Sequence, residues 1–96
     1  MSVGELLKEK REDILRITAQ HGASKVRIFG SVARGEDGPD SDLDLLVEVE
    51  LNHSSWFPAG LIIDLEDFLG CKVDVVTEAG LHWYIRERVL QEAVPL

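Results

Sequence analysis

Residues 30–44 read Gly-Ser-Val-Ala-Arg-Gly-Glu-Asp-Gly-Pro-Asp-Ser-Asp-Leu-Asp, and this stretch constrains the fold more than any other part of the chain. An alternating apolar segment ends just before Gly30 and Ser31, and a second one opens with Asp42 and Asp44. The residues between them are rich in glycine and include a proline, which is typical of a turn. We therefore expect two strands joined by a turn, with a small polar pair at one strand end and two carboxylates at the other strand start.

Hydrophobic spacing on either side of this stretch predicts the other elements. Ser2 and Glu5 have the spacing of a capping box at the start of a first helix, and Gly22 and Gly70 are suited to helix C-termini. The expected elements are a helix over 2–21, a strand over 24–29, a short helix over 31–35, a strand over 42–50, a helix over 56–69, a strand over 72–76 and a helix over 81–93. This order predicts an α+β fold of the two-layer type, with helices packed on a three-stranded sheet. The spacing leaves the strand directions open.

Bulk composition narrows the function classes. The chain has 96 residues, which suits one domain over 1–96, and a net charge of -8 from 18 acidic and 10 basic residues. That balance disfavours direct nucleic-acid binding, which needs a surplus of Lys and Arg. The sequence has no 18-residue apolar run and no signal-peptide core, so we expect no membrane association and a cytoplasmic location. Cys71 is the single cysteine, and we interpret it as a buried structural thiol.

Three aspartates are candidates for one site. Asp42 and Asp44 are two residues apart on a strand, so they share a face at a spacing of about 6.5 to 7 Å. Asp74 lies between two valines in the 72–76 strand and faces away from them. If that strand lies beside the first, the third carboxylate joins the other two. Such a trio suits a pair of divalent ions.

Electrostatics limits how three carboxylates can share a site. At a separation of about 5 Å and an effective dielectric near 20, the three pairs together repel by roughly 10 kcal/mol. The carboxylates must therefore be held apart, take up a proton, or bind cations. Because the donors are hard oxygens with no His or Cys nearby, Mg²⁺ or Mn²⁺ is favoured over Zn²⁺.

The turn that follows the first strand supplies features suited to an anion. Gly30 allows close approach of the backbone to a ligand, and Ser31 adds a hydroxyl at the start of the short helix. Arg34 lies one turn on, where it can reach a phosphate oxygen or brace the loop through a carboxylate such as Asp40. A phosphate turn and a carboxylate trio together suit a metal-bound triphosphate.

These residues resemble a known family. Gly30-Ser31-x-x-Arg34-Gly35, then Ser41-Asp42-x-Asp44 and Asp74 in a Val-Asp-Val strand, is similar to the pattern of the minimal nucleotidyltransferases (MNT) of the DNA polymerase beta-like superfamily. The resemblance extends from end to end of the chain, including Leu-Gly-x-x-Val-Asp at 69–74. It implies a mixed sheet covered by helices, and transfer of a nucleoside monophosphate from an NTP to an acceptor.

The resemblance also implies roles for the residues. Gly30 and Ser31 would hold the β- and γ-phosphates, with Arg34 as a further nucleotide contact. Asp42 and Asp44 would bind two Mg²⁺ ions. Asp74 would bind the catalytic metal and help to deprotonate the acceptor hydroxyl.

The resemblance further implies a partner, because many small members of the family act as antitoxins beside HEPN-domain toxins and some attach AMP to a tyrosine of the toxin. The leading hypothesis is AMP transfer from ATP to a hydroxyl of a HEPN partner. Two alternatives stay open, a non-catalytic antitoxin that acts by sequestration and a small-molecule nucleotidyltransferase. A homodimer and a hetero-oligomer are both compatible with the sequence.

Two aromatic clusters have no assigned role. His82, Trp83 and Tyr84 enter the last helix, and packing in the core or at the helix start is the favoured interpretation, with a partner surface second. Trp56, Phe57 and Pro58 precede the third long helix, and we expect at least one of those two rings to be exposed.

Overall fold

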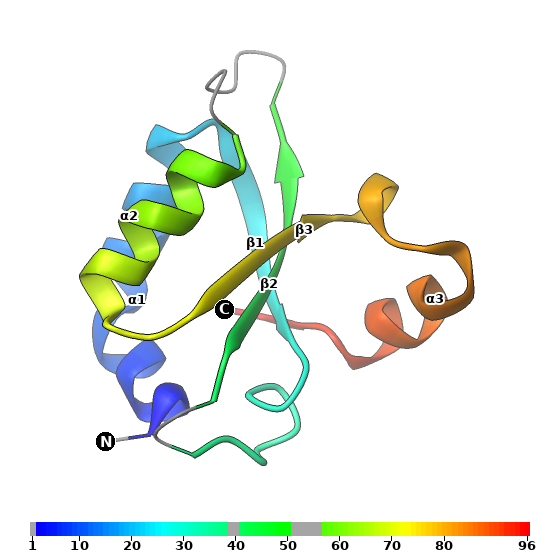
Figure 1. Ribbon diagram of the computed structural model, residues 1–96, viewed down its shortest axis with the longest axis horizontal. Helices are drawn as coiled ribbons and strands as arrows, with labels where there is room; N and C mark the ends of the chain where they lie inside the picture. The colour runs from blue at the N-terminus through cyan, green and yellow to red at the C-terminus, as the bar shows by residue number, and fades with distance from the viewer. Residues whose placement is uncertain (1, 39–40, 51–56) are drawn as a thin grey trace.

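The computed structural model describes residues 2–38, 41–50 and 57–96, and its elements lie close to the predicted ranges (Figure 1). The elements are helix α1 (Val3–Gln20), strand β1 (Ala23–Phe29), strand β2 (Leu43–Val49), helix α2 (Ala59–Leu69), strand β3 (Val73–Thr77), the 3₁₀ helix η1 (Glu78–Gly80), helix α3 (Trp83–Glu92) and strand β4 (Val94–Pro95).

The strands form a mixed sheet in the order β3-β2-β1-β4. β1 and β2 are antiparallel, whereas β2 and β3 run parallel. The predicted count of three strands is wrong, because the described residues contain a fourth, in which Val94 and Pro95 pair with Ile28 and Arg27. Sequence patterns assign this dipeptide to the end of a helix. Proline is nevertheless compatible with an edge strand, since an edge residue does not need its N–H for a second neighbour.

The main core lies between the sheet and the helices α1 and α2, which lie together on one side of it (Figure 1). β2 is its centre, since Leu43, Leu45 and Val47 are at most 1% exposed. Helix α3 stands apart on the other side and buries only Val89. Its last turn leads into β4, so the C-terminal end of α3 is fixed next to β1. Among the described residues, no helix is long and apolar enough to cross a membrane.

Local signals explain the ends of the helices. The Glu5 amide donates to the Ser2 hydroxyl at 3.2 Å, which confirms the predicted cap of α1. Gly22 and Gly70, which follow α1 and α2, have φ values of 78° and 71°, a region that glycine adopts without strain. The segment 31–35 forms a hydrogen-bonded turn and not the predicted short helix, because Gly35, with φ 72°, ends the helical path at once.

Candidate active site

Gly30 and Asp44 are in direct contact where β1 ends and β2 begins. Phe29, the last residue of β1, pairs with Asp44 in the antiparallel register, and this places Gly30 beside the carboxylate. Gly30 has φ 78°, and a Cβ atom there would lie 2.3 Å from Asp44 Oδ2 and 3.2 Å from its Cγ. The carboxylate therefore occupies the space that any other residue at position 30 would need for its side chain.

The sheet register brings the predicted aspartates together at the N-terminal ends of the neighbouring strands β2 and β3. Asp44 is the register partner of Asp74 across the parallel pair β2 and β3, and Asp42 immediately precedes β2. Asp44 is half-buried, whereas Asp42 and Asp74 are exposed. Burial raises the pKa of Asp44, and the negative charges of Asp74 and Asp42 raise it further. The expectation that the strand of Asp74 lies beside that of Asp42 and Asp44 is confirmed.

The three carboxylates do not converge on a single point. Within residues 2–38, 41–50 and 57–96, no three acidic, His or Cys side chains are close enough to form a ready metal cage. Of the three outcomes that electrostatics allows for the trio, the structure thus shows carboxylates that are held apart. The donor set still fits a hard divalent cation, because all its donor atoms are carboxylate oxygens.

The turn after β1 presents free polar groups close to this carboxylate. The amide of Glu36 donates to Ser31 O at 2.9 Å and the amide of Arg34 donates to Gly30 O at 3.2 Å, which closes the turn. No described residue accepts a hydrogen bond from the backbone amides of residues 31–33 or from the Ser31 hydroxyl. A run of free amides at a tight turn is an arrangement that suits an anion such as phosphate.

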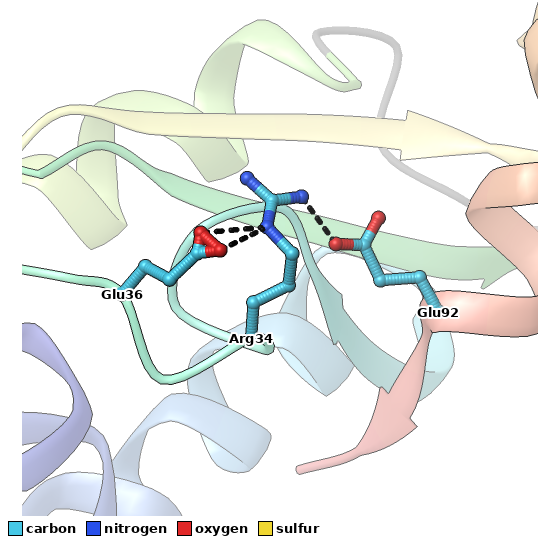
Figure 2. A network of polar contacts seen from close by, with 3 residues as sticks. All are labelled: Arg34, Glu36 and Glu92. Carbon is cyan, nitrogen blue, oxygen red and sulfur yellow. Dashed lines mark hydrogen bonds and ion pairs between the residues drawn. The ribbon is translucent and has the colours of Figure 1, made fainter.

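Arg34 is held by two carboxylates (Figure 2). Its Nε donates to both carboxylate oxygens of Glu36, at 3.1 and 3.2 Å, and its Nη1 donates to Glu92 Oε1. These bonds raise the pKa of Arg34, with the bond to Glu92 the larger cause. The sequence predicted either a phosphate contact or a loop brace through Asp40, and Asp40 lies outside the described residues. The brace exists with Glu36 and with Glu92, a residue that sequence reasoning missed.

The remaining predicted residues differ in outcome. Core packing of the aromatic cluster is wrong, because Trp83 is 81% and Tyr84 67% exposed, although the rings of His82 and Tyr84 contact each other at the helix start with centroids 4.4 Å apart. The cause is that α3 stands away from the main core. Cys71 is partly buried against that core, and burial raises the pKa of its thiol. Phe57 also packs there, while Trp56 lies outside the described residues.

Comparison with known proteins gives consistent matches over nearly the whole chain. The family model described as "Nucleotidyltransferase domain" matches residues 7–96. A Methanocaldococcus jannaschii protein with the provisional name of protein adenylyltransferase is 39% identical over 88 residues, which are 92% of this chain and 95% of the relative. Protein adenylyltransferase MntA of Thermococcus cleftensis is 36% identical, over 93% of this chain and 95% of its own.

Solved structures agree with the sequence relatives. A structure provisionally described as a minimal nucleotidyltransferase has a TM-score of 0.83 and 52% identity, and the match covers 97% of this chain and 95% of that one. A crystal structure described as a toxin–antitoxin with AMP-PNP has a TM-score of 0.74 at 19% identity, over 88% of this chain and 69% of that one. The second match supports the fold.

Proposed function

The chain belongs to the nucleotidyltransferase domain family, and on that basis we propose that it transfers AMP from ATP to a hydroxyl group of a partner protein. One observation carries the proposal: Asp44 lies against Gly30 of the turn and beside Asp74 of β3, so a phosphate turn and paired carboxylates meet at one place. These two relatives are named protein adenylyltransferases and align with 92% and 93% of this chain, which supports a protein as the acceptor.

Each residue of the site has its own proposed role in the reaction. The amides of the turn at Gly30 and Ser31 would bind the β- and γ-phosphates, with their partial positive charge directed at the anion. Asp42, Asp44 and Asp74 would hold Mg²⁺, which when bound offsets charge on the α-phosphate. Asp74 would accept the proton of the acceptor hydroxyl. The acceptor oxygen then forms a bond to the α-phosphorus, the bond from that phosphorus to the bridging oxygen breaks, and pyrophosphate leaves.

The proposed partner is a HEPN-domain toxin, with this chain acting as its cytoplasmic antitoxin. The family resemblance supports this pairing, and so does the description of the more distant structure as a toxin–antitoxin with AMP-PNP. Transfer to a separate protein also agrees with the exposed position of Asp74, which leaves the reacting edge open to a large acceptor.

Label transfer tests the proposal. The chain is incubated with the candidate toxin, Mg²⁺ and ATP labelled at either the α- or the γ-phosphate. Radioactivity on the toxin from α-labelled ATP alone is the expected result, and Asp42→Asn or Asp44→Asn should abolish it while the far-ultraviolet circular dichroism stays unchanged. If the chain inhibits the toxin by forming a stable complex and the toxin carries no radioactivity, sequestration and not AMP transfer is the mechanism. Normal turnover by either variant would refute the assigned site.

A further inference from the structure

A carboxylate from the last helix reaches the loop of the candidate active site. Glu92 is the final residue of α3, 58 positions beyond Arg34 in sequence, and it accepts a hydrogen bond from the Arg34 guanidinium (Figure 2). Its side chain is only 18% exposed, compared with 58% for Glu36, the second partner of the same guanidinium. Glu92 is therefore the more firmly placed of the two carboxylates.

Arg34 itself belongs to the phosphate turn. Its amide donates to Gly30 O at 3.2 Å, so its backbone is fixed relative to the residue that contacts Asp44. The charges of both Arg34 and Glu92 reach Asp44, where they act with opposite sign on the carboxyl group. Arg34, Glu92 and Arg88 also line one surface recess. The ion pair thus lies at the margin of the site and not on a remote face.

The hydrogen bonds leave part of the guanidinium free. Nε and Nη1 bond to Glu36 and Glu92, while Nη2 has no acceptor among the described residues. An arginine side chain loses much rotamer freedom when it is ordered, and carboxylates that fix it beforehand reduce what a ligand must supply. The planar fork of donors then presents its remaining N–H groups in a set direction, which suits a phosphate oxygen.

We propose that Glu92 is a positioning residue for nucleotide binding, which holds the Arg34 guanidinium so that its free N–H groups meet the triphosphate of the incoming nucleotide. This inference rests on the proposed function, because it takes ATP as the ligand of the site. It assigns to α3 a part in the active site that no element of the sequence motif indicates.

The direction in which ATP affinity changes when Glu92 is neutralised distinguishes a positioning role from simple charge repulsion. Glu92 is negative and lies close to a site for an anion, so Coulomb repulsion alone predicts that its neutralisation strengthens ATP binding. Positioning predicts the reverse, since a guanidinium with a weaker tether must be ordered by the ligand. The two readings cannot both hold for one variant.

Calorimetric titration with Mg²⁺–ATP tests the inference. Glu92→Gln should raise the Kd about fivefold, because a charge-assisted hydrogen bond becomes a neutral one. The matched control is Glu87→Gln, which makes the same change on the same helix at an exposed residue whose side chain has no hydrogen bond or ion pair with another described residue, and it should bind like the wild type. A double-mutant cycle completes the test: in an Arg34→Gln background, Glu92→Gln should have no further effect on Kd.

The outcomes are distinct. Tighter binding by Glu92→Gln, binding equal to that of Glu87→Gln, or an unchanged penalty in the Arg34→Gln background would overturn the positioning role and leave the proposed function intact. Failure of the wild-type chain to bind Mg²⁺–ATP would instead refute the proposed function. Urea unfolding of each variant shows whether a change in Kd follows from loss of stability, which would also overturn the inference.

Discussion

Replacement of Gly30 by alanine should reduce AMP transfer strongly while it lowers the stability of the fold only slightly. Gly30 has φ 78°, and an added Cβ would meet Asp44 Oδ2 at 2.3 Å. The left-handed conformation costs an alanine about 1 kcal/mol relative to glycine. The clash itself is inexpensive for the fold, because the nearest atom is the free end of a side chain that can rotate. Rotation, however, moves the carboxylate away from its place against the turn.

Gly35 provides the matched control, since it has φ 72° in the same loop and an added Cβ would meet no atom within 4 Å. Gly30→Ala and Gly35→Ala should therefore lose similar free energies of unfolding in urea, about 1 kcal/mol each. They should differ in label transfer, where Gly30→Ala loses about 100-fold, because a displacement of about 1 Å in a reacting group has effects of that size. Equal transfer rates in the two variants would refute the reasoning, and so would a loss of stability confined to Gly30→Ala.

Three further predictions follow from charge and burial. Asp44→Asn should stabilise the metal-free protein by about 1 kcal/mol at neutral pH, as measured in urea with EDTA, since it removes a half-buried charge that Asp74 and Asp42 repel. Protonation stabilises a folded state in which a carboxyl pKa is raised, so this advantage should shrink as the pH falls toward that pKa and the wild-type Asp44 becomes neutral. Cys71 should react with a disulfide reagent at pH 8 more slowly than glutathione, because burial, Glu66 and Asp42 raise its pKa, and equal rates would contradict this. ATP should bind at least tenfold more weakly in EDTA than with Mg²⁺, since the carboxylates repel the free anion, and equal affinity in calorimetry would count against the metal site.

The motif residues could be predicted because local rules govern them. The alternation in 24–29 and 42–50 predicts two strands joined by a glycine-rich turn. The antiparallel register that sets Gly30 beside Asp44 comes from the structure, because the spacing left the strand directions open. Asp74 needed one more assumption, that its strand lies next to β2, which the pattern allowed but did not require.

The features that the sequence did not reveal depend on tertiary contacts. β4 consists of Val94 and Pro95, which have too little length to show a strand period, and it exists because the end of α3 returns to β1. The exposure of Trp83 and Tyr84 contradicts the usual burial of large aromatic rings, since only the Val89 side of α3 faces the protein. The contact of Glu92 with Arg34 joins positions 58 residues apart, and no spacing rule connects them.

The arrangement of the carboxylates explains how the fold tolerates an acidic site. The repulsion of roughly 10 kcal/mol that we expect from the sequence assumes three charges about 5 Å apart in partly buried surroundings. Asp42 and Asp74 are instead exposed, and the three groups do not converge, so water screens them and each pair costs nearer 1 kcal/mol. A penalty of that size is small beside the stability of a typical domain. Under the proposed function, Mg²⁺ would serve the reaction and would not be required for folding, in contrast to small zinc domains that unfold without their metal.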